Sequence, residues 1–141
     1  MKIKILVLSL MVALFIGLSA EETVLKGDIE VKITNIKISQ NGNLFIALYK
    51  GEENFKAKKN SQAEAIISVK EKECTYLFKD IPYANYAIAL FHDKNGNEKI
   101  DTGLFGIPKE GYGFSNKSRK YKKASFDLKT EKYKVIIKIK Y

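Results

Sequence analysis

The chain has 141 residues, 45% of them hydrophobic, which is enough for one domain with its own core. It carries 25 basic and 16 acidic residues, for a formal net charge of +9 at pH 7. One cysteine excludes an internal disulfide, and one histidine excludes a metal site built from several imidazoles. All basic residues except one are lysines and no basic helix is indicated, so nucleic acid is a poor candidate partner.

Residues 1–20 have the layout of a secretory signal peptide. A head with two lysines precedes the apolar run 5–16, and small residues follow it, which suits cleavage after Ser19 or Ala20. The run is too short for a comfortable transmembrane helix, and an uncleaved anchor is the alternative. We therefore expect an exported protein, periplasmic or extracellular, with no permanent membrane anchor and a single mature domain over residues 21–141.

The first half of the domain alternates between strands and turn signals. Apolar residues at every second position predict a half-buried strand over residues 27–33, which can continue toward Ile38. The Gln-Asn-Gly-Asn run at 40–43 is typical of a tight hairpin turn, because asparagine and glycine tolerate positive φ. Residues 44–49 are apolar on both faces, which predicts a central strand, and the lysine-rich stretch 51–61 predicts a loop with room for one helical turn.

The second half repeats the strand pattern. Further strands are predicted near 65–69, 76–78, 86–92, 125–128 and 132–141. With the first two they make about seven short strands, and no long amphipathic helix is indicated. The sequence therefore predicts an all-β fold, an antiparallel β-sandwich of immunoglobulin-like or prealbumin-like type. Its expected core residues are Ile46, Ile88, Leu90, Ile137 and Ile139.

A polar loop with oxygen-bearing side chains at alternate positions follows the strand 86–92. Calcium loops use this spacing, because a tight turn points every second side chain at one centre. Glu98, however, stands where such loops prefer glycine, and Leu104 stands where they place a bidentate glutamate. The sequence favours a loop held by its own hydrogen bonds, with weak calcium binding as the alternative. The calcium ligands would be Asp93, Asn95, Asn97, the carbonyl of Lys99, and Asp101.

His92 and Glu110 are the residues on which an enzyme would depend. A histidine beside carboxylates is common in hydrolytic sites, so a small hydrolase or isomerase is the alternative function. No nucleophile motif, phosphate loop or cysteine pair accompanies them. The favoured interpretation is that His92 orients the polar loop by hydrogen bonding, and that the protein is not an enzyme.

The segment 103–115 holds four of the nine glycines of the chain, with aromatic residues between them. Glycine allows positive φ or a close approach of the backbone, and the aromatic side chains need a surface to pack on. The segment is therefore either a binding loop or a long loop pinned over the end of the sandwich, and the two interpretations are compatible. For a binding loop over residues 92–116, the contact residues would be His92, Glu110, Tyr112 and Ser115.

The densest basic run of the chain is at residues 117–123. Such a run can bind an acidic partner, such as a polyanion or an anionic component of the cell envelope. The sequence favours the other interpretation, a solvated loop and strand edges whose lysines discourage edge-to-edge pairing.

The stretch from Phe78 to Ser115 resembles the DUF2141 family. Ala84 and Glu98 depart from its pattern, since the family usually has glycine at both positions. Weaker similarity extends from about Gly27 to the end of the chain. The resemblance implies a small exported β-protein but no reaction. It is carried by Phe78, Ile81-Pro82, Tyr86-Ala87, Phe91-His92-Asp93, Asn95-Gly96-Asn97, Asp101, Gly106-Ile107-Pro108 and Glu110 to Asn116.

Overall fold

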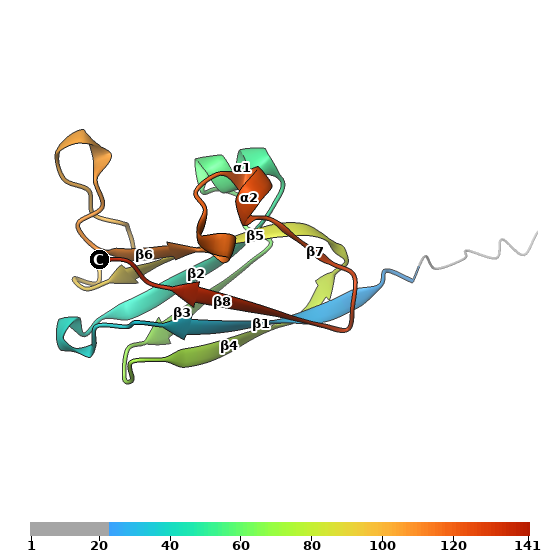
Figure 1. Cartoon of the computed structure of the whole chain (residues 1–141), viewed down its shortest axis with the longest axis horizontal. Coiled ribbons are helices and arrows are strands. Elements are labelled where there is room, and N and C mark those ends of the chain that lie inside the picture. Colours follow the sequence, from blue (N-terminus) through green and yellow to red (C-terminus); the bar gives the residue numbers. More distant parts are fainter. Residues whose placement is uncertain (1–22) are drawn as a thin grey trace, which may run out of the picture.

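The computed structural model describes residues 23–141, which form two β-sheets and two short helices (Figure 1). The predicted signal peptide, residues 1–20, lies outside the described residues. The strands are β1 (Lys26–Thr34), β2 (Asn43–Lys50), β3 (Ala63–Ser68), β4 (Cys74–Pro82), β5 (Ala84–Asp93), β6 (Gly111–Phe114), β7 (Phe126–Leu128) and β8 (Lys132–Lys138). The helices are α1 (Glu52–Ala57) and α2 (Tyr121–Ala124), with 3-10 turns at Ile38–Gln40, Leu104–Gly106 and Ser115–Lys117. In this part of the chain, no helix has the length and apolar character needed to span a membrane.

The strands divide between a three-stranded sheet, in the order β4-β1-β8, and a five-stranded sheet, in the order β3-β2-β5-β6 with β7 beside β5. The fold is thus mostly β, as the alternating runs predict. One pairing corrects the antiparallel prediction, because β1 and β8 run parallel, with Val31 opposite Val135. These strands are not consecutive in the chain, so no turn between them sets their relative direction.

The turn at residues 40–43 is a second correction. Asn41 and Gly42 have positive φ angles of 51° and 78°, as predicted. The strands on either side, however, belong to different sheets and do not form a hairpin. Gly42 is required because a Cβ atom there would lie 2.0 Å from the carbonyl oxygen of Asp93. The turn is therefore a corner between the sheets that packs against the start of the polar loop.

The two sheets share one apolar core, to which β2 and β5 contribute from one sheet and β1 and β8 from the other. Period-two alternation puts every second side chain of each strand on this face. Burying each large apolar side chain contributes about 1.5–3 kcal/mol. The residues predicted for the core are all buried, namely Ile46, Ile88, Leu90, Ile137 and Ile139.

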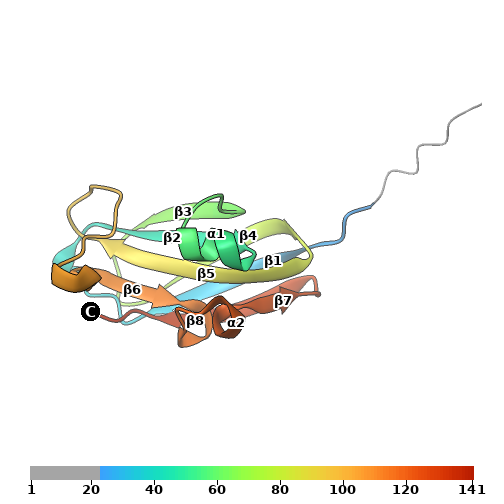
Figure 2. The same ribbon diagram turned by 90° about the horizontal axis from the view of Figure 1, so that it is seen from above.

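The outer face of the five-stranded sheet carries a second apolar cluster, over which α1 and α2 lie (Figure 2). Phe55 of α1 and Tyr121 of α2 pack there against Tyr49 and Ala87. The helical turn expected within residues 51–61 is α1. The helices cover the outer face of β5 at Ala87, and the polar loop follows the C-terminal end of this strand.

Candidate functional site

His92 ends the inward face of β5 and is completely buried. Its Nδ1 atom is hydrogen-bonded to the Tyr141 hydroxyl at 2.7 Å, and its Nε2 atom donates to the Asn41 carbonyl. The Tyr141 hydroxyl in turn accepts from the backbone N–H of Lys37 at 2.8 Å. A carbonyl oxygen can only accept, so the Nε2 atom carries a proton. Both ring nitrogens are used to join three segments of the chain.

Ser115 bridges a gap along one edge of β5. β6 pairs with this edge as far as Ala89 and β7 as far as Tyr86, so the N–H of Ile88 falls between the two. The buried Ser115 hydroxyl accepts that N–H at 2.9 Å and donates to the Ala124 carbonyl at 2.7 Å. The serine hydroxyl thus takes the place of a backbone hydrogen-bond partner that neither β6 nor β7 supplies, and it links α2 to the sheet.

Asp93 organises the polar loop from the outward face of β5. Its side chain is completely buried, and its two carboxylate oxygens accept the N–H groups of Gly96 at 2.8 Å and Glu98 at 2.9 Å. Glu98 has a φ of 60°, the left-handed conformation that glycine adopts most readily. The sharp turn that calcium loops make at this position is therefore present without its glycine.

The remaining oxygen-bearing side chains of the loop form hydrogen bonds with one another. The amides of Asn95 and Asn97 donate to the two carboxylate oxygens of Asp101, at 2.6 and 2.8 Å. Their own oxygens accept the N–H groups of Asn97 and Lys99, at 3.2 and 3.0 Å, in successive Asx turns. The four predicted side-chain ligands thus lie together in one hydrogen-bonded loop, and calcium binding by that loop stays a prediction.

Glu110 is almost completely buried and clamps both ends of the polar loop. One carboxylate oxygen accepts the N–H of Lys94 and the other accepts that of Asp101, each at 3.0 Å. Hydrogen bonds from N–H donors to a carboxylate are strong, so they hold the loop closed. Across the described part of the chain, no group of three or more His, Cys, Asp and Glu side chains is placed to hold a metal ion. Glu110 and His92 share one end of the fold but bond to separate partners.

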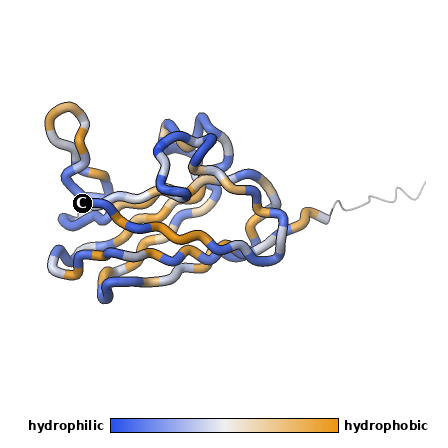
Figure 3. The backbone as a smooth tube through the Cα atoms, viewed as in Figure 1, coloured by the Kyte–Doolittle hydropathy of each residue, from blue (hydrophilic) through white to orange (hydrophobic). Residues whose placement is uncertain are grey.

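Residues 102–108 form an arm that projects from the polar loop (Figures 1 and 3). Leu104, Phe105 and Ile107 of this apolar arm are 83%, 98% and 64% exposed, and a backbone bridge closes its base. Exposed apolar groups gathered in one place mark contact sites. The arm is therefore the part of the predicted binding loop that faces solvent, whereas the predicted contact residues His92, Glu110 and Ser115 are buried.

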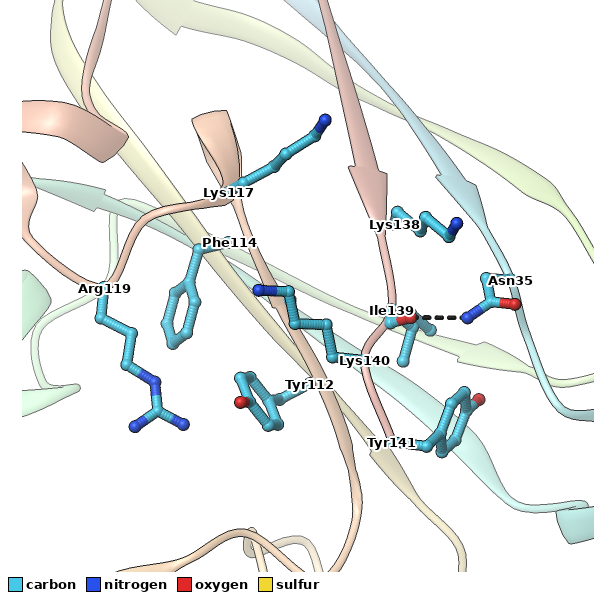
Figure 4. A pocket seen from close by; sticks show the side chains of 10 residues that line it. Asn35, Tyr112, Phe114, Lys117, Arg119, Lys138, Ile139, Lys140 and Tyr141 are labelled. Atoms are coloured by element: carbon cyan, nitrogen blue, oxygen red, sulfur yellow. Dashed lines mark hydrogen bonds between the residues drawn. The ribbon is translucent and has the colours of Figure 1, made fainter.

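Tyr112 is the predicted contact residue that is accessible, and it lines a cleft of about 630 Å³ (Figure 4). No acidic side chain lines this cleft. Among residues 23–141, the salt bridges do not include any of the cations that line it. We call it the basic cleft, after its charged lining residues Lys117, Arg119, Lys138 and Lys140.

The basic cleft forms where β6 meets the chain end beyond β8. The N–H and carbonyl groups of Tyr112 bond to the carbonyl and N–H groups of Lys140, both at 2.9 Å. The guanidinium carbon of Arg119 lies 4.7 Å from the centre of the Tyr112 ring. Figure 4 shows Arg119 and Lys140 on opposite sides of the aromatic pair of β6. Gly113 allows this close pairing, because a Cβ atom there would lie 2.5 Å from Cγ2 of Ile137.

Lys138 and Lys140 are site residues that the sequence reasoning missed. Their alternation with apolar residues predicts the solvent-facing side of the last strand. The alternation shows that both lysines face solvent, but it does not show which segment of the chain lies beside them. The basic run at 117–123 contributes only Lys117 and Arg119 to the cleft.

A family model described as "Uncharacterized protein conserved in bacteria (DUF2141)" matches residues 31–136. The match spans most of the described domain, from β1 to β8, and includes the polar loop, the apolar arm and β6. Comparison with curated proteins and with solved structures gave no match. The resemblance seen in the sequence is confirmed, and the chain belongs to the DUF2141 family.

Proposed function

We propose that this protein is an exported, non-enzymatic module of the cell envelope that binds anionic ligands at the basic cleft. The observation that carries the proposal is the gathering of four cations around one cleft whose lining includes no acidic side chain. Like charges held close together repel one another, and a bound anion relieves that repulsion. The aromatic ring of Tyr112 beside them offers a flat surface to the same ligand.

We also propose that the two sheets form a sandwich of immunoglobulin-like or prealbumin-like type. The apolar core that the sheets share supports this arrangement. Binding residues are often carried on loops that such a rigid scaffold positions. The polar loop, the apolar arm and the C-terminus lie at one end of the fold, where a ligand can reach them together (Figure 1).

The geometry does not favour a hydrolase or isomerase that uses His92 and Glu110. The imidazole of His92 is buried, with one nitrogen hydrogen-bonded to Tyr141 and the other to Asn41. The buried carboxylate of Glu110 accepts hydrogen bonds from two backbone N–H groups. A general acid or base needs a proton or lone pair within reach of a substrate. We therefore propose that these residues shape the site and do not react.

Inorganic tripolyphosphate is a suitable probe for the basic cleft, with binding measured by titration calorimetry. The mature protein should bind it, and the affinity should fall as the salt concentration rises, because salt screens exposed charges. Replacing the four cations by glutamine should weaken binding by about tenfold or more, which corresponds to about 1.4 kcal/mol. The variant is Lys117→Gln, Arg119→Gln, Lys138→Gln and Lys140→Gln.

A matched control separates the cleft from the overall positive field of the protein. It carries the same loss of four charges at exposed lysines outside the cleft, namely Lys59, Lys70, Lys72 and Lys79. Its tripolyphosphate affinity should stay within about threefold of wild type, a difference of about 0.7 kcal/mol. Equal weakening in the two variants, or no binding by the wild-type protein, would contradict the proposal. Melting temperatures check that both variants are folded.

A further inference from the structure

The basic cleft adjoins a second hollow. This aromatic groove has a volume of about 770 Å³, within the range of sites that hold small molecules. Tyr112, Phe114 and Arg119 line both the cleft and the groove. A single ligand can therefore occupy both by crossing β6.

The floor of the aromatic groove is apolar and lies on the outer face of the five-stranded sheet. Phe45 of β2 and Phe91 of β5 stack there, with ring centres 5.0 Å apart and ring planes 11° apart. Ala47 and Ala89 also line the groove, and their small side chains leave room above the sheet. The outer face of a solvated sheet ordinarily carries polar side chains, so this floor is suited to an apolar occupant.

Two cations line the groove near α1 and β6. The ammonium group of Lys58 lies 3.9 Å from the centre of the Phe55 ring and within reach of two further rings. Burial lowers the pKa of Lys58, and the charge of Arg119 lowers it further. Glu64 and Glu98 also line the groove, but no salt bridge within residues 23–141 joins either acid to these cations. Lys58 also donates a hydrogen bond to the Phe55 carbonyl, so its charge is held by neutral partners and is paired with no acid of the described chain.

We propose that the cleft and the groove together bind an anionic amphiphile, a molecule with a phosphate or carboxylate head and an apolar chain. The head lies among the cations of the basic cleft, and the chain lies over Phe45 and Phe91. Contact with the chain removes the aromatic floor from water, which stabilises the complex in proportion to the apolar area covered. This inference rests on the proposed function, because it takes anion binding at the cleft as given and adds the nature of the rest of the ligand.

The apolar arm bounds the groove on another side. Ile100, Gly106 and Pro108 belong to its lining, while Leu104 and Phe105 beside them are exposed. A chain longer than the groove therefore meets further apolar surface where it leaves. The exposed tip of the arm therefore belongs to the same proposed binding site.

A series of alkyl phosphates tests the proposal, with ethyl, butyl, hexyl and octyl phosphate used below the concentrations at which they aggregate. The affinity of the wild-type protein should rise about fourfold for each added methylene until the groove is filled. Phe91→Ser removes part of the floor, and Ala47→Gln obstructs it from a half-buried position with little effect on the core. The apolar control is Ile136→Ser, at a position that is 66% exposed on the other sheet.

Phe91→Ser and Ala47→Gln should flatten the dependence of affinity on chain length, and Ile136→Ser should preserve it. If tripolyphosphate binds but chain length has no effect, the amphiphile is wrong and the proposed function stands. If no phosphate binds, both are wrong. An unchanged dependence in both groove variants would overturn the placement of the chain. Binding to phosphatidylglycerol vesicles without binding to monomeric octyl phosphate would also overturn it, in favour of a membrane-docking surface.

Discussion

Asp93 accepts two backbone N–H groups of the polar loop, and each of its carboxylate oxygens keeps a second lone pair. If these lone pairs bind calcium, millimolar calcium should raise the melting temperature, because an ion that binds only the folded state stabilises it. At ten times the dissociation constant, the gain in unfolding free energy is about 1.4 kcal/mol. Asp93→Ala should abolish this response, and it should also lower stability without calcium by leaving two N–H groups without their acceptor.

Glu98 gives a second test of the same loop. Its φ of 60° is unfavourable for a side chain, so Glu98→Gly should relieve strain and strengthen the calcium response. Asp127→Ala removes a surface carboxylate of β7 and should leave the response unchanged, which makes it the control. A melting curve indifferent to calcium up to about 10 mM would leave only the hydrogen-bonded loop.

At the scale of an element, β5 is the strand on which both the core and the site depend. Ile88 lies at its centre and is completely buried. Ile88→Ala should lower the unfolding free energy by about 2–5 kcal/mol, through lost burial and a cavity. The same change at Ile136, which is 66% exposed, should cost less than about 1 kcal/mol. Denaturant unfolding measures both, and similar losses at the two positions would contradict the shared core.

The strands that the sequence predicts have at least one face to bury, because burial makes their apolar residues alternate or run without a break. β6 was not predictable in this way. Gly111 and Gly113 have low strand propensity, and their inner side is occupied by side chains of other segments. A Cβ atom at Gly111 would lie 2.5 Å from the Tyr141 ring, and one at Gly113 would lie 2.5 Å from Ile137. Only the approach of the chain end explains why glycines stand in this strand.

The candidate site was predictable in the polar loop and not in the basic cleft. Asp93 and its neighbours are local in sequence, so their spacing shows that they share one turn. Lys140 meets Tyr112 only because β8 runs parallel to β1, and no local pattern specifies that direction. His92 and Ser115 were predicted as contact residues but are buried. The sequence does not separate the two roles, because the same polar groups can bind a ligand or form hydrogen bonds with backbone groups in the interior.

At the scale of the whole molecule, the position of β1 is compatible with the predicted export. β1 begins at Lys26, so cleavage after Ser19 or Ala20 leaves all described strands intact. The cut removes two lysines and no acid, and the net charge falls from +9 to +7. N-terminal sequencing of the mature protein should therefore begin at Ala20 or Glu21. Full-length protein free in the cytoplasm, with Met1 retained, would contradict export.

The pairing of the first strand with the last also determines when this domain can fold. Asn35, just after β1, bonds to the carbonyl of Ile139, 104 positions later. While the ribosome is still extending the chain, one edge of β1 has no neighbour and the core lacks Val135 and Ile137. Contacts between such distant segments form slowly. The domain therefore cannot complete its fold until β8 has been synthesised.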